Sequence, residues 1–117
     1  VLSEMLDFFQ RGLDKLYRQG VSDVIIDPGF GFGKTIEQNY TILRGLEIFQ
    51  ELHVPILVGL SRKSMFYKAL SVTPNDVLPA TTAAHMLALQ RGAHLLRVHD
   101  VAAAKQAIKI FQLDKNE

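Results

Sequence analysis

Residues 24–35 read VIIDPGFGFGKT, a pattern that predicts a short strand, a glycine-rich loop and the start of a helix. The apolar run at 24–26 is typical of a buried strand, and Asp27 follows where such a strand reaches the surface. Glycines at alternate positions allow a ligand to approach the backbone closely. A simple strand-to-helix turn needs glycine as well, so the loop by itself leaves function open. Thr35 and Gln38 have the spacing of a capping box, which places a helix start at Thr35.

The bulk composition is that of one ordinary globular domain. The 117 residues are 48% hydrophobic and 21% charged, with a formal net charge of +1. This charge gives no general attraction to nucleic acid or to an anionic membrane surface, so we expect neither as a partner. The absence of cysteine excludes disulfides and a thiolate nucleophile, and it is compatible with the cytoplasmic location that we expect. No apolar run approaches the roughly 18 residues of a membrane span. The first residue is Val1 rather than Met, so we expect the chain to be part of a longer polypeptide.

The rest of the chain repeats the order of strand and helix. Strands are expected at 24–26, 56–59 and 94–98. Helices are expected at 4–19, from Thr35 to about His53, in a short piece that follows Ser64 and ends at Leu70, at 80–90 and at 102–111. The strand segments are continuously apolar, as in parallel sheets that are covered on both faces. We therefore predict an α/β fold with about three parallel strands and covering helices, in one domain over residues 1–117 without a linker. Three strands are too few to close a barrel.

Polar residues follow the three expected strands at a regular interval. Asp27, Lys63 and His99 are separated by 36 residues each, about the length of one βαβ repeat. Because equivalent ends of parallel strands lie at one edge, these three groups are expected to converge there. That edge is where α/β sheets and barrels bind their ligands.

Each of these groups has a functional and a structural interpretation. The carboxylate of Asp27 can accept two hydrogen bonds from an amidine-like edge of a heterocycle, or it can cap the following turn. Lys63, between Arg62 and Ser64, suits an anion or a carbonyl oxygen, although basic residues are also common in solvated loops. Both interpretations stay open at this point.

Arg97 and His99 alternate across Val98, so both side chains are expected on one side of the strand end. A guanidinium provides a planar fork for phosphate oxygens, and an imidazole adds a second donor. Arg97 lies in an apolar run, where an unpaired charge is costly, so it needs a partner. That partner is either a bound anion or Asp100 in a structural ion pair.

Two other kinds of site fit the sequence less well. No spacing of His, Asp and Glu indicates a metal site made by the protein alone, and His53, His85 and His94 are interpreted as packed or surface residues. Gly33-Lys34-Thr35 matches the end of a Walker A loop, but Pro28 stands where the first glycine of that motif is required. A P-loop nucleotide triphosphatase is therefore a minor alternative.

Three motifs together resemble dihydropteroate synthases, which are enzymes of folate biosynthesis. They are DPGFGFGK at 27–34, GLSRKS at 59–64 and RVHDV at 97–101. The resemblance runs from about Val21 to the last helix and matches only the C-terminal half of the family pattern. It implies that the chain is the C-terminal part of a (β/α)₈ TIM barrel, a fold of about 250 residues.

The resemblance also implies a reaction and a set of site residues. The family is a transferase that condenses 4-aminobenzoate with (7,8-dihydropterin-6-yl)methyl diphosphate, giving 7,8-dihydropteroate and pyrophosphate, and it is the target of sulfonamides. By this likeness the pterin is held by Asp27, Gly59 and Lys63, the diphosphate by Arg97 and His99, and 4-aminobenzoate by Gly31, Phe32, Lys63 and Ser64, with Lys63, Arg97 and His99 as catalytic residues. It implies Mg²⁺ bound with the diphosphate, whose protein ligand is expected outside this chain.

Further expectations concern the isolated chain. An open set of strands exposes its edges, so we expect self-association, as a symmetric homodimer, and little or no catalysis by the 117 residues alone. The alternative within the same fold is a non-catalytic or methyl-transferring pterin-binding barrel domain, related to corrinoid-dependent methyltransferases.

Overall fold

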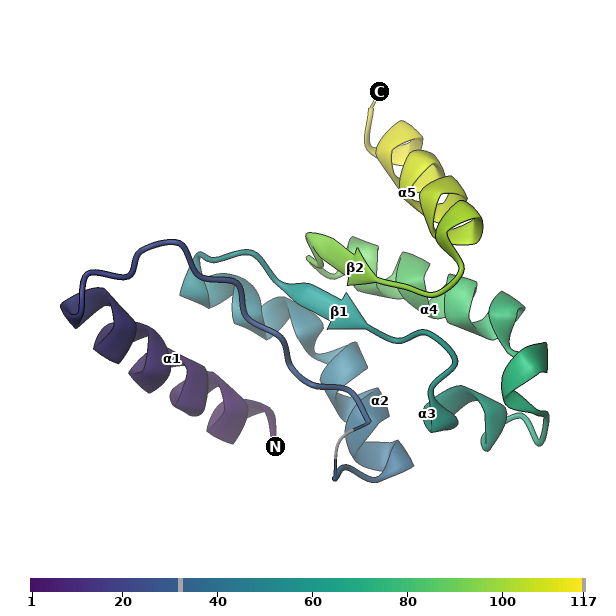
Figure 1. Ribbon diagram of the computed structural model, residues 1–117, viewed down its shortest axis with the longest axis horizontal. Coiled ribbons are helices and arrows are strands. Elements are labelled where there is room, and N and C mark those ends of the chain that lie inside the picture. The colour runs from purple at the N-terminus through teal and green to yellow at the C-terminus, as the bar shows by residue number, and fades with distance from the viewer. Residues whose placement is uncertain (32, 117) are drawn as a thin grey trace.

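A small parallel sheet lies at the centre of the protein, whose computed structural model describes residues 1–31 and 33–116 (Figure 1). Strand β1 (Leu57–Gly59) pairs in parallel with β2 (Leu95–Arg97), and Gly59 lies opposite Arg97 in the register. A third extended segment joins the other edge of β1 through a single bridge between Ile26 and Ile56. The α/β class and the parallel direction of the strands are therefore confirmed.

The strand expected at 24–26 is wrong in extent, because only Ile26 pairs. Its N–H donates to the Pro55 carbonyl at 3.0 Å, and its carbonyl accepts from the Leu57 N–H at 2.8 Å. In a parallel pair alternate residues bond to the same neighbour, so the next donor would come from residue 28. That residue is Pro28, and the donor that the Val24 carbonyl would need is residue 55, which is also a proline. Neither has an N–H, so the ladder is limited to Ile26.

The expected helices are present with shifted boundaries, and the short η2 is additional. In chain order they are α1 (Leu2–Arg18), α2 (Ile36–Arg44), η1 (Leu46–Leu52), α3 (Ser64–Tyr67), η2 (Pro74–Asp76), α4 (Leu78–Gln90) and α5 (Val101–Lys115). The helix expected from Thr35 to His53 divides at Gly45 into an α-helix and a 3₁₀ helix. The expected capping box is present, because the Thr35 hydroxyl accepts from the Gln38 N–H at 3.0 Å and the Gln38 side chain accepts from the Thr35 N–H at 2.9 Å.

The core lies between the sheet and the helices behind it in Figure 1, mainly α2, η1 and α4. Fully buried members include Ile42, Leu46, Phe49, Ile56, Val58, Leu60, Met65 and Val77. The expectation that both faces of the strands are covered holds for Val58 in β1, but Leu95 in β2 is 40% exposed. The outer edge of β2 has no paired strand among the residues that the structure describes.

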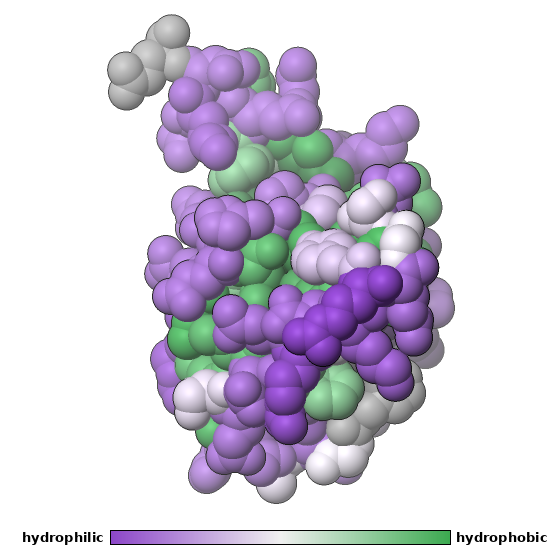
Figure 2. Space-filling view, turned by 90° about the vertical axis from the view of Figure 1, so that its left-hand side faces the viewer, coloured by the Kyte–Doolittle hydropathy of each residue, from purple (hydrophilic) through white to green (hydrophobic). Residues whose placement is uncertain are grey.

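Apolar side chains also reach the surface away from the core. Figure 2 shows hydrophobic patches between polar residues on the face at the left of Figure 1, where α1 lies. The most exposed large apolar side chains are Phe8, Ile25, Leu70, Val101, Ile110 and Leu113. In the described parts of the chain, no helix is long and apolar enough to cross a membrane.

Candidate active site

Three strand ends that are distant in sequence meet at one edge of the sheet. Asp27 follows the bridge at Ile26, and Arg97 ends β2, 70 positions later. The Arg97 Nη1 atom lies 3.1 Å from Asp27 Oδ2, and the two side chains are 55% and 37% exposed. The structure therefore brings together the groups that the sequence assigned to opposite ends of one ligand.

Gly59 makes this contact possible because it has no side chain. A Cβ atom added to Gly59 would lie 2.5 Å from Arg97 Nη2 and 2.9 Å from its Cζ atom. The guanidinium therefore lies over Gly59 and reaches across β1 towards Asp27. The resemblance places Gly59 in the pterin site, and in this structure the Arg97 side chain occupies the space over it.

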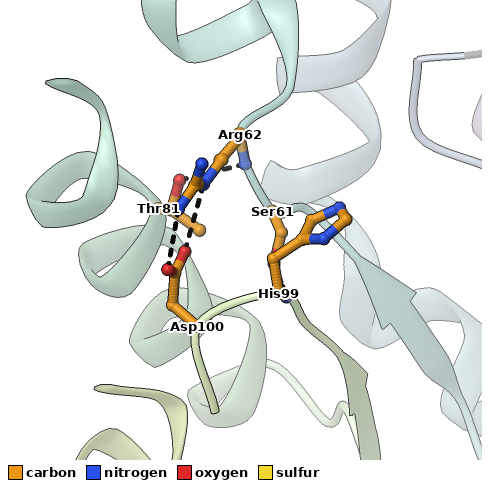
Figure 3. Close-up of polar contacts among 5 residues, drawn as sticks. All are labelled: Ser61, Arg62, Thr81, His99 and Asp100. Atoms are coloured by element: carbon orange, nitrogen blue, oxygen red, sulfur yellow. Dashed lines mark hydrogen bonds and ion pairs between the residues drawn. The ribbon is translucent and has the colours of Figure 1, made fainter. Parts of the chain in front are cut away.

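The alternative pairing of Arg97 with Asp100 is wrong. Asp100 instead accepts two hydrogen bonds from Arg62, at 2.9 Å from Nη2 and 3.3 Å from Nε (Figure 3). This hydrogen bonding lowers the pKa of Asp100 and raises that of Arg62. Arg97 pairs with Asp27 instead.

The loop after Asp27 is ordered by two side chains. Asp27 Oδ1 accepts the Gly29 N–H at 2.8 Å, so this carboxylate caps its own turn with one oxygen and meets Arg97 with the other. The Gly31 N–H donates to Asn39 Oδ1 at 2.9 Å, and Asn39 in α2 is only 2% exposed. Sequence reasoning missed Asn39. The available signal was an amide on the apolar face of the expected helix, where a buried polar group needs a partner.

Lys63 lies against the same loop. A Cβ atom on Gly31, whose φ is +93°, would lie 3.3 Å from Lys63 Cδ and 3.5 Å from its Nζ atom. Lys63 precedes α3 as its N-cap residue, and Ser64 is the first residue of that helix. Phe32, the other residue expected to contact 4-aminobenzoate, lies outside the described residues.

A pocket of about 290 Å³ lies at this edge, and its lining residues are Gly59, Ser61, Lys63, Arg97, Val98 and His99. Three of the predicted site residues with polar side chains therefore share one cavity. The His99 N–H donates to the Ser61 hydroxyl at 3.2 Å, which ties the loop after β2 to the loop after β1. Ser61 was not singled out from the sequence, although its place directly after a strand was visible.

Lys34, Thr35 and His94 have hydrogen-bond partners within the fold, whereas the buried Nε2 atom of His85 has none among the described residues. Lys34 Nζ donates to the Gly29 carbonyl at 2.9 Å, and Thr35 caps α2. His94 Nδ1 accepts the Ile56 N–H at 3.1 Å, and His85 is 3% exposed, with a pKa that burial lowers. Over residues 1–31 and 33–116, no group of three or more His, Cys, Asp or Glu could hold a metal ion.

Comparison with known proteins also points to a pterin-binding enzyme. Residues 1–99 match the family described as pterin binding enzyme. The chain is 36% identical over 114 residues to the dihydropteroate synthase of Escherichia coli (strain K12), covering 96% of this chain and 40% of that protein. It is 37% identical over 118 residues to the dihydropteroate synthase of Haemophilus influenzae, covering 99% and 43%.

Solved structures show the same relationship. A crystal structure of Yersinia pestis dihydropteroate synthase superposes with a TM-score of 0.94 at 33% identity, covering 99% of this chain and 49% of that one. The Xanthomonas albilineans enzyme in complex with 7,8-dihydropteroate gives 0.93 at 39% identity, covering 99% and 47%. The chain thus spans less than half the length of these relatives. The resemblance expected from the three motifs is confirmed, and the chain belongs to the pterin-binding enzyme family.

Proposed function

We propose that the protein carrying this chain is a transferase of folate biosynthesis. It condenses 4-aminobenzoate with (7,8-dihydropterin-6-yl)methyl diphosphate and releases 7,8-dihydropteroate and pyrophosphate. The observation that carries the proposal is the contact of Arg97 with Asp27 beside a pocket that Lys63 and His99 also line. One edge thus offers an acceptor for a pterin and donors for a diphosphate, and the relatives are named as synthases of this product.

The substrate would bind by exchanging partners with the ion pair. An amidine-like pterin edge replaces Arg97 at Asp27, and the diphosphate replaces Asp27 at Arg97. Exposed ion pairs contribute only about 0–1 kcal/mol, so opening this pair costs little compared with the new contacts. Asp27 keeps hydrogen-bond donors and Arg97 keeps anionic oxygens as partners throughout.

The chemical step is a displacement at the methylene carbon of the pterin. The bond from that carbon to the diphosphate oxygen breaks, its electron pair leaves with pyrophosphate, and the amine nitrogen of 4-aminobenzoate forms the new bond and loses a proton. Arg97 and His99 hold the leaving group as its charge grows, which is the largest electrostatic task in the reaction. Lys63 binds the pterin and borders the amine. Gly31, Phe32 and Ser64 are proposed for the 4-aminobenzoate site, which is also the site that sulfonamides would occupy.

Three further predictions accompany this proposal. The chain forms the C-terminal part of a (β/α)₈ barrel, supported by its superposition on dihydropteroate synthases. Mg²⁺ accompanies the substrate diphosphate, but the described residues provide no ligand set for it, so no step here is assigned to the metal. The cytoplasmic location also stays a prediction.

The direct test is turnover by the complete polypeptide. We expect pyrophosphate release that requires both 4-aminobenzoate and the pterin diphosphate, with dihydropteroate as the product. Methyl transfer from a methylated pterin without pyrophosphate release would instead support the methyl-transferring pterin-binding domain. ATP hydrolysis alone would support the P-loop alternative. We expect little or no turnover from the 117 residues alone, because the chain spans less than half the length of its relatives and, among the described residues, this pocket is lined by those at and after the ends of β1 and β2.

We also propose that the protein is a homodimer. A groove of about 540 Å³ between α4 and α5 is mostly apolar, and Ile110 beside it is 58% exposed. Light scattering of the complete protein is expected to give twice the monomer mass, and Ile110→Glu is expected to shift it towards the monomer. Lys109→Glu, one position away on the same helix, serves as the control. A wild-type monomer at high concentration would contradict the proposal.

A further inference from the structure

We infer that Arg62 and Asp100 are positioning residues, whose ion pair holds the loops after β1 and β2 together so that Lys63 and His99 face one pocket. The inference rests on the proposed function. Arg62 directly precedes Lys63 in the chain, and Asp100 directly follows His99. The pair therefore joins the two loops one residue away from the groups that contact substrate.

The contact has the geometry of a two-point clamp. Arg62 Nη2 lies 2.9 Å from Asp100 Oδ1, and Nε lies 3.3 Å from Oδ2 (Figure 3). A guanidinium that meets a carboxylate at two points fixes orientation as well as distance. The side chains are 41% and 22% exposed, and ion pairs of this exposure contribute little to stability. We therefore infer that the pair serves to orient the two loops and not to stabilise the fold.

Two more hydrogen bonds fix the backbone on either side of the clamp. The Arg62 N–H donates to the hydroxyl of Thr81 at 3.3 Å, and Thr81 in α4 is 1% exposed. The His99 N–H donates to Ser61 at 3.2 Å. Arg62 has φ of +52°, which is uncommon for a residue with a side chain and persists where surrounding contacts enforce it. The clamp and the buried threonine are the contacts that enforce it here.

Arg62 is not itself placed to bind the diphosphate. Its guanidinium is turned to Asp100, and neither residue lines the pocket that contains Lys63, Arg97 and His99. Figure 3 shows the imidazole of His99 pointing away from the Arg62–Asp100 pair. The two residues therefore act through their neighbours in the chain.

The test uses Arg62→Met, Asp100→Asn, the double variant and Arg62→Lys in the complete protein. We expect each single change to lower kcat/KM for the pterin diphosphate at least about tenfold, since small displacements of positioned groups are costly. The double variant is expected to be no worse than the poorer single variant, because both changes break the same contact. Arg62→Lys, which keeps the charge but loses the fork, is expected to recover part of the activity. The midpoint of urea unfolding is expected to change little.

The matched control is Arg11→Met, which breaks another exposed Arg–Asp pair, with Asp7 at 2.9 Å inside α1. We expect its kcat/KM to equal that of wild type. The inference would be overturned if kcat/KM were unchanged in both single variants. It would also be overturned if the loss of kcat/KM in the double variant equalled the product of the two single losses.

Hydrogen exchange separates this inference from the proposed function. In the clamp variants, faster amide exchange is expected in residues 60–64 and 98–101, whatever reaction the protein catalyses. If the wild-type protein released no pyrophosphate, the proposed function would be wrong, but hydrogen exchange would still test the clamp. Unchanged amide exchange in both segments would reject the clamp.

Discussion

Arg97→Ala is expected to lower kcat about 10²–10³-fold, the usual effect of removing one donor that stabilises charge in a transition state. Arg97 reaches over Gly59 into the pocket, and His99 would be left as the only one of the two proposed diphosphate ligands. The measurement is steady-state pyrophosphate release by the complete protein, with both substrates varied. A loss in kcat as well as in kcat/KM indicates that the guanidinium acts on the leaving group and not only in binding.

Arg97→Lys is the control for charge. It keeps the positive charge but loses the planar fork, so we expect an intermediate rate. The fold should survive both substitutions, because the contact of Arg97 with Asp27 is exposed and such pairs contribute only about 0–1 kcal/mol. If Arg97→Ala turned over at the wild-type rate with its unfolding midpoint unchanged, the role assigned to Arg97 would be wrong.

Gly59→Ala is expected to lower kcat/KM for the pterin diphosphate by about tenfold or more, since displacements near 1 Å of a positioned group can be costly. The added methyl group would lie 2.5 Å from Arg97 Nη2, so the guanidinium has to move. The contact is with the far end of a flexible side chain, and Gly59 has no positive φ, so the fold should tolerate the change. Steady-state kinetics and thermal unfolding of the complete protein together distinguish displacement of the guanidinium from a loss of stability.

Gly12→Ala is the matched control for this substitution. Gly12 lies in α1, and apart from its chain neighbours and the nearby backbone of its own helix no described atom lies within 4 Å of the position its Cβ would take. Activity should stay unchanged, and the helix should be stabilised by about 0.5–1 kcal/mol. Equal activity in Gly59→Ala and wild type would show that activity does not depend on the position of the Arg97 guanidinium over Gly59.

Much of the architecture was readable from local pattern. The apolar runs that became β1 and β2, the capping box at Thr35 and the alanine-rich α4 each depend on neighbours within a few residues. The segment before Asp27 was overestimated because its apolar pattern is that of a strand, while Pro55 and Pro28 lack the N–H groups that would extend the pairing on either side of Ile26. The division of the second helix at Gly45 was missed for a related reason, since apolar periodicity alone does not distinguish an α-helix from a 3₁₀ turn.

The candidate site was also predicted from the sequence only in part. The amino-acid sequence alone predicted the parallel α/β class, the three motifs and the convergence of their polar ends, because the alternation of strands and helices and the spacing of the motifs can be read along the chain. Which cation meets which carboxylate was settled only by tertiary packing: Asp27 with Arg97, and Asp100 with Arg62. Those pairings depend on the register of β1 against β2, on the bare backbone at Gly59 and on the left-handed turn at Arg62, which are set by contacts between segments far apart in the chain.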